Sequence, residues 1–137
     1  MKQTDELLKC IKNSHELDDF LEKQEFININ ISEYLNMIIE KKELVKSEVI
    51  KSSGLDRVYA YQILNGTRTP SRDKLIQFAF GMKLTLDETQ TLLKYNGMAP
   101  LYAKNRRDSI ILFAINERAS VIDLNIMLDN KKEKILD

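Results

Sequence analysis

Apolar residues recur three and four positions apart along most of the chain. Leu75, Phe78, Ala79 and Met82 show this spacing, and only four glycines and two prolines interrupt the 137 residues. Because residues three and four apart lie on one face of an α-helix, the pattern predicts an all-α fold. Strand-like alternation is confined to residues 26–31, which we interpret as an extended linker or a helix edge.

Capping residues and glycines indicate where the helices begin and end. Asp56 is a suitable N-cap, and Thr85 with Glu88 matches a capping box. Gly54 lies where the chain reverses between two helices and a left-handed backbone is often needed. The polar end, residues 130–134, is expected to fray. The expected helices span residues 5–11, 16–23, 32–41, 46–53, 56–66, 70–81, 85–97, 106–118 and 120–129.

The composition restricts the class of protein. A chain of 137 residues that is 43% hydrophobic and 31% charged can bury a core without disulfides or metals. No apolar stretch approaches the roughly 20 residues that span a bilayer, and the acidic start differs from a signal peptide. We therefore expect a cytoplasmic protein that does not enter a membrane.

Few side chains are suited to catalysis or metal binding. Cys10 is the only cysteine and His15 the only histidine, so neither a disulfide nor an ordinary zinc site is expected. We find no Ser-His-Asp or Cys-His spacing and no phosphate-binding loop. The sequence thus predicts a protein without cofactor or metal that is not an enzyme.

A stretch of the sequence occurs twice. Residues 72–93 (RDKLIQFAFGMKLTLDETQTLL) and 107–128 (RDSIILFAINERASVIDLNIML) align at an offset of 35. The alignment predicts one helical hairpin used twice, and convergence on a common amphipathic pattern is the alternative. The second copy either extends the core or forms a dimer surface. Its segment 110–115 is apolar all round, which indicates burial inside the protein or against a copy of itself.

Residues 44–71 (LVKSEVIKSSGLDRVYAYQILNGTRTPS) carry the functional signal. A short helix, a turn at Gly54 and a second helix describe a helix-turn-helix. The second helix is expected to direct Ala60 and Ile63 inward, and to leave its other face free to enter a groove.

This stretch resembles the lambda-repressor-like, Cro/C1-type (XRE) family of helix-turn-helix regulators. The resemblance covers about residues 32–97. Its carriers are Ser53-Gly54-Leu55, the Tyr59-x-x-x-Ile63 pattern, Asn65-Gly66 and Arg68-Thr69-Pro70-Ser71. It implies a five-helix domain, in a sequence-specific transcriptional regulator that binds double-stranded DNA as a homodimer. The recognition helix, about residues 56–65, would enter the major groove.

The resemblance also implies which residues contact DNA. Arginine can bind guanine and glutamine can bind adenine through two hydrogen bonds each, which suits Arg57 and Gln62 to base recognition. Lys46 and Arg68 suit phosphates. The full set of DNA-contacting residues is Lys46, Asp56, Arg57, Val58, Tyr61, Gln62, Asn65, Thr67 and Arg68.

A second hypothesis is a non-catalytic protein-interaction module on the same fold. Asp56 places a negative charge near the groove, where a role as helix cap explains it better than a base contact. Val58 can contact only a thymine methyl. Exposed tyrosines such as Tyr61 also suit protein interfaces, so a protein partner is an alternative to DNA.

Zero net charge conceals an uneven distribution. Residues 1–40 carry a net charge of −5, residues 41–74 a net charge of +4, and residues 75–137 a net charge of +1. The positive segment coincides with the helix-turn-helix, where phosphates would lie. We expect an acidic helical arm over residues 1–30, a helix-turn-helix domain over 31–97, and a helical hairpin with a tail over 98–137. That hairpin is the candidate surface for dimerisation or for binding a partner.

Overall fold

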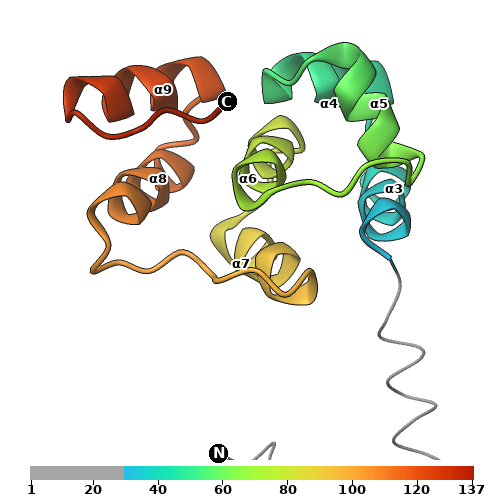
Figure 1. The fold of residues 1–137 in the computed structure, drawn as a ribbon, viewed down its shortest axis with the longest axis horizontal. Helices are drawn as coiled ribbons and strands as arrows, with labels where there is room; N and C mark the ends of the chain where they lie inside the picture. The colour runs from blue at the N-terminus through green and yellow to red at the C-terminus, as the bar shows by residue number, and fades with distance from the viewer. Residues whose placement is uncertain (1–29) are drawn as a thin grey trace, which may run out of the picture. The chain divides into compact units, whose positions relative to one another are not determined.

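The computed structural model describes residues 30–137, which fold into α-helices without a strand (Figure 1). The predicted all-α class is confirmed over this range, whereas the helices expected at 5–11 and 16–23 lie outside it. No helix in the described range is long and apolar enough to cross a membrane. The helices are α3 (Ile31–Lys41), α4 (Lys46–Ser53), α5 (Arg57–Leu64), α6 (Arg72–Gly81), α7 (Leu86–Tyr95), α8 (Arg106–Asn116) and α9 (Val121–Asn130).

Residues 31–137 form one compact unit with α6 at its centre. In Figure 1, α6 lies between α3–α5 on one side and α8–α9 on the other. It contacts α4, α7 and α9, while α3 packs on α5. Buried apolar side chains from every helix form the core, among them Leu35, Val49, Ile63, Phe78, Leu93, Ile111 and Leu128.

Side-chain caps define the helix starts as the sequence predicts. Asp56, Ser71 and Ser120 each accept a hydrogen bond from a backbone N–H in the first turn of α5, α6 and α9. Thr85 and Glu88 form the expected capping box on α7. Gly54 ends α4 with a φ of 71°, the left-handed conformation that the turn requires.

Gly81 allows α4 to approach α6 closely. A Cβ atom at this position would lie 2.6 Å from the carbonyl oxygen of Val49 and 2.9 Å from Cβ of Ser53. The buried Gln77 side chain also donates a hydrogen bond to the carbonyl of Ser53 at 3.3 Å. Because the end of α4 is fixed against α6 in this way, the turn between α4 and α5 has a defined position.

The structure confirms that one helical hairpin is used twice, as α6–α7 and α8–α9. Arg72 pairs with Asp108, and the equivalent Arg107 pairs with Asp73, at 2.9 and 2.8 Å. Likewise α6 contacts α9, and α8 contacts α7. Such reciprocal contacts are characteristic of isologous association, so the two hairpins are related by a pseudo-two-fold axis.

The repeat extends beyond the stretch found in the sequence. The side chain of Gln90 exchanges two hydrogen bonds with the backbone of Leu101, and Asn125 does the same with Leu136, 35 residues further on. Arg107 also donates to the carbonyls of residues 134 and 135. Arg72 donates to those of residues 99 and 100.

The expectation that the chain end frays is wrong. Leu136 is only 2% exposed and belongs to the core, because Asn125 binds its backbone and Arg107 binds the two carbonyls before it. The polar composition of residues 130–134 concealed this anchor, which lies just beyond them.

The second hairpin extends the core but leaves some apolar side chains uncovered. Ile111 and Ala114 of α8 are fully buried. Phe113 is 55% exposed, whereas its repeat equivalent Phe78 is fully buried on α6, the helix on which α4 packs. Segment 110–115 is therefore buried on one side only.

Candidate nucleic-acid interface

Helix α5 has a buried face and an open face, as the sequence predicts. Ala60 and Ile63 are fully buried, whereas Arg57 and Val58 in the first turn are exposed. Asp56 caps the helix, and its carboxylate accepts the backbone N–H of Tyr59 at 3.0 Å. The first turn of α5 is therefore the part that is open to a ligand.

Arg57 and Tyr61 lie beside a shallow hollow between α4 and α5. The guanidinium carbon of Arg57 is 5.9 Å from the ring centre of Tyr61, within cation–π range. The wall of the hollow is mostly apolar and is formed by Ser47, Ile50, Lys51, Leu55, Arg57 and Tyr61. Tyr61 thus presents a half-buried ring next to a cation.

Gln62 and Arg68 act as one unit. Nε of Arg68 donates to Oε1 of Gln62 at 2.7 Å, and the backbone N–H of Arg68 donates to the Gln62 carbonyl at 3.1 Å. One lone pair of the Gln62 amide oxygen is therefore already engaged. The Gln62 amide group and the remaining N–H groups of Arg68 stay available as donors, which favours acceptors such as phosphate oxygens or guanine.

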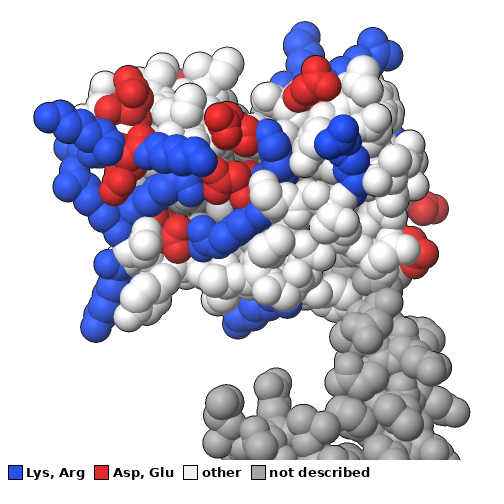
Figure 2. All heavy atoms as spheres, in the orientation of Figure 1, with Lys and Arg blue, Asp and Glu red and all other residues white. Residues whose placement is uncertain are grey.

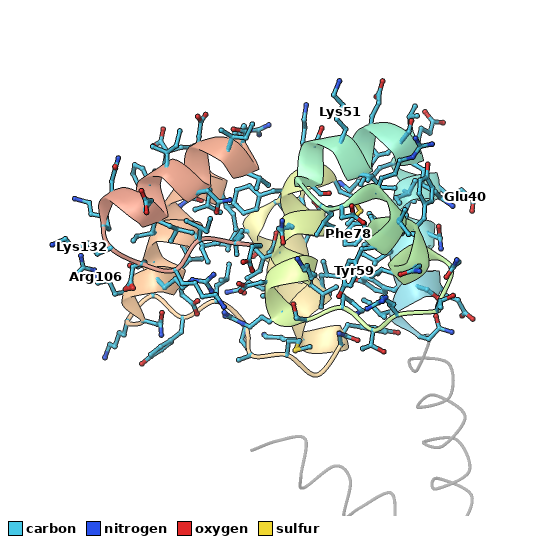
Figure 3. All side chains as sticks on the ribbon, turned by 45° about the horizontal axis from the view of Figure 1, so that its top comes forward. Glu40, Lys51, Tyr59, Phe78, Arg106 and Lys132 are labelled. Atoms are coloured by element: carbon cyan, nitrogen blue, oxygen red, sulfur yellow. The ribbon has the colours of Figure 1, made fainter. Side chains whose placement is uncertain are left out.

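Two cations flank the ring of Tyr59. The guanidinium carbon of Arg68 lies 5.2 Å from the ring centre, and Nζ of Lys74 on α6 lies 5.4 Å from it. Figure 3 shows Tyr59 between α5 and α6. Both cations are within cation–π range of the ring.

The loop after α5 is held by its own side chains. Oδ1 of Asn65 accepts the backbone N–H of Thr67 at 3.0 Å, and the same N–H contacts the Gln62 carbonyl at 2.9 Å. Asn65, Thr67 and Arg68 are all exposed. The loop therefore presents its polar groups in a fixed conformation beside α5.

The cations near α5 differ from the arginines that begin α6 and α8. Within residues 30–137, no ion pair joins the basic side chains around α5 to a carboxylate. By contrast, Arg72 at the start of α6 and Arg106 and Arg107 at the start of α8 are all paired. Figure 2 accordingly shows basic and acidic groups side by side over α8 and α9. The basic side chains around α5 that form no ion pair are Lys46, Lys51, Arg57, Arg68 and Lys74.

The structure also changes which charges contribute to the basic segment. Lys42 forms an ion pair with Glu88 at 2.9 Å, and Arg72 is bound to Asp108. These two cations of residues 41–74 stabilise the fold and are not free to bind a ligand. Lys51 and Lys74 were not among the predicted site residues. Lys51 lines the hollow and points away from the domain in Figure 3.

The described residues, 30–137, offer no candidate metal site. No group of three or more histidine, cysteine or acidic side chains in this range could hold a metal ion. Comparisons with protein-family models, curated proteins and solved structures found no match for the chain. The geometry of this surface is therefore the basis for a functional proposal.

Proposed function

We propose that this protein is a sequence-specific DNA-binding transcriptional regulator of the lambda-repressor-like, Cro/C1 type, which binds a two-fold-related site as a homodimer. The observation that carries the proposal is the set of unpaired cations around the open face of α5. Lys46, Lys51, Arg57, Arg68 and Lys74 lie on α5 or on the elements that adjoin it, and none of them forms an ion pair within the described residues. Basic side chains that lie together without ion-pair partners are suited to bind a polyanion such as DNA.

The first turn of α5 supports a role in base recognition. Arg57 is exposed and next to Val58, which is 65% exposed. In a major groove, arginine can contact guanine and valine can contact the methyl group of thymine. Lys46 begins α4 and lies on the exposed surface, where it can contact the DNA backbone.

The loop after α5 supports a role in phosphate binding. Gln62 and Arg68 are already bonded to each other, so both donors are oriented before DNA arrives. Preorganised side chains lose less conformational freedom on binding. Lys74 adds a second cation next to Tyr59.

The test is selection of DNA from a randomised duplex pool by the full chain, followed by binding measurements over a salt series. We expect one preferred sequence and an affinity that falls as salt rises. Arg57→Ala should reduce the preference between sequences. Arg68→Ala should weaken binding to all sequences and reduce the salt dependence by about one released counterion. Lys104→Ala, on the exposed loop before α8, is the matched control and should bind as the wild type. Absent or salt-independent binding would contradict the proposal.

The hollow beside Tyr61 favours a second candidate, a protein-interaction module. It adjoins an apolar wall formed by Ile50 and Leu55. A partner protein could insert a side chain there, in which case Tyr61→Ala would abolish its binding. Co-purification of a stoichiometric protein together with absent DNA binding would favour this candidate.

A further inference from the structure

Helix α9 carries an apolar stripe that its repeat equivalent lacks. Ile122 is 73% exposed and Ile126 is 53% exposed, and a spacing of four residues places them on one helix face. The equivalent positions on α7, 35 residues earlier, are the exposed Asp87 and Thr91. Since α7 needs no apolar residue there, the fold itself does not require the two isoleucines.

The ends of α9 carry charges that complement a second α9. Glu117 and Arg118 lie in the turn before α9, and Asp129 and Lys131 lie at its end. Within residues 30–137 none of these four exposed side chains forms an ion pair. When two α9 helices lie antiparallel, the start of one faces the end of the other. Each end carries one acid and one base and can therefore pair with a second α9, and the antiparallel arrangement also places opposite ends of the two helix dipoles side by side.

We propose that α9 is the dimerisation helix, and that a second copy of this chain packs antiparallel on Ile122 and Ile126 about a two-fold axis. Burying two isoleucines from each copy supplies an apolar centre, and the charged ends form its polar rim. A self-complementary patch of this kind satisfies the requirement of an isologous interface.

The position of α9 connects this dimer to the proposed DNA site. A Cβ atom added at Gly54 would lie 3.4 Å from a methyl carbon of Val121, so α9 begins next to the turn between α4 and α5. Antiparallel pairing places the two turns at opposite ends of the α9 pair. Two recognition helices would then address two half-sites, a step that rests on the proposed function.

The test is sedimentation of the full chain over a range of concentrations, with a variant that copies α7 onto α9. Ile122→Asp with Ile126→Thr introduces the residues that the equivalent helix already tolerates, so the variant should fold and keep its helical circular dichroism. We expect the wild type to dimerise and this variant to weaken the dimer at least a hundredfold. The control Met37→Asp with Val45→Thr removes exposed apolar surface elsewhere and should leave the dimer unchanged.

A charge exchange tests the antiparallel register. Lys131→Glu should weaken the dimer, and adding Glu117→Lys should restore it. A monomeric wild type at about 100 µM would overturn the proposal. The proposal would also be overturned if the dimer persisted in the variant Ile122→Asp with Ile126→Thr, or if Phe113→Ala on α8 broke it instead. Sedimentation needs no DNA, so a monomer that still selects one DNA sequence refutes the dimer and leaves sequence-specific DNA binding in place. A dimer that selects none refutes the DNA-binding function alone.

Discussion

Arg107 on α8 donates to both carboxylate oxygens of Asp73 on α6, at 2.9 and 2.8 Å. The paired side chains are only 19% and 20% exposed. Hydrogen bonding to Asp73 raises the pKa of Arg107, so the guanidinium stays charged at any relevant pH. The repeat reproduces this pair between Arg72 and Asp108 with the roles exchanged.

The first prediction concerns this reciprocal pair. Arg107→Ala removes the bidentate contact with Asp73 and two hydrogen bonds to the backbone near Leu136. It should lower the free energy of unfolding by about 2–4 kcal/mol, because a partly buried carboxylate loses its partner. Urea denaturation measures the change. Lys104→Ala serves as control and should change stability by less than about 0.5 kcal/mol. An equally small effect of Arg107→Ala would show that the pair does not hold the hairpins together.

The second prediction concerns the crossing of α4 and α6. Gly81→Ala should lower the free energy of unfolding by about 1–3 kcal/mol, because its Cβ would overlap the Val49 carbonyl. Helix propensity alone would favour alanine by about 1 kcal/mol, so the sign of the effect is diagnostic. Asn116→Ala at the repeat-equivalent, exposed position is the matched control and should be neutral. Thermal unfolding of both variants checks the prediction, which a stabilised Gly81→Ala would contradict.

Periodicity and caps were sufficient to predict the helices of residues 30–137, and the alignment of the two stretches predicted the repeated hairpin. Periodicity and caps act within a few residues, and Asp56 and Thr85 cap the helices that the sequence assigns to them. The pseudo-two-fold relation was not predictable. The alignment shows that Arg72 and Arg107 are equivalent, but it does not show that Arg72 binds Asp108 and that Arg107 binds Asp73. Leu136 was missed for a related reason: its anchor is the side chain of Asn125, a contact between residues 11 apart.

The residues of the candidate site stay a prediction, and the contacts among them could not be predicted from the sequence. The motif identified Arg57, Gln62 and Arg68. It did not show that Arg68 holds the Gln62 amide oxygen, because the hydrogen bond depends on how the loop after α5 folds back. Lys74 was missed because it lies on the next helix, outside the motif, and only the fold brings it to Tyr59.

The third prediction concerns the capping box of α7. The backbone hydrogen bond at Thr85, followed by the contact with Lys42, lowers the pKa of Glu88 below 4.5. A carboxyl whose pKa is lower when folded adds stability above its unfolded pKa and loses it as pH falls through the folded value. Glu88→Gln should therefore be less stable than the wild type near pH 7, by less than about 1 kcal/mol for so exposed a group. The difference should disappear once the pH lies well below the folded pKa of Glu88, where the carboxyl is as neutral as the amide. Denaturation at both pH values checks this, and a difference that persists in acid would argue against it.

The fourth prediction concerns the end of the chain. Leu136→Ala should lower the free energy of unfolding by about 2–4 kcal/mol, because the side chain is 2% exposed. Ile135→Ala is the matched control, since its side chain is 40% exposed and should cost much less. Urea denaturation compares the two. Equal costs would indicate that the end of the chain is not anchored in the core.

The fifth prediction rests on the proposed DNA-binding function and concerns Gln62 with Arg68. Because Arg68 already engages one lone pair of the Gln62 amide oxygen and orients the side chain, we expect Gln62 to act as a donor rather than bind adenine through two hydrogen bonds. Gln62→Glu reverses the chemistry at that position, since a carboxylate can only accept and would repel phosphates. It should keep its contact with Arg68, leave stability within about 0.5 kcal/mol of the wild type, and lose at least tenfold in DNA affinity.

Gln90→Glu on α7 is the control for a general charge effect. It breaks the contact of the Gln90 amide with the Leu101 carbonyl, far along the chain from α5, and should retain most of the affinity for DNA. Fluorescence anisotropy on the selected duplex measures both variants. If the duplex instead loses affinity when its adenines are replaced by purine, which lacks the N6 amino donor, and only with Gln62 present, then the Gln62 amide oxygen accepts from adenine and the prediction is contradicted.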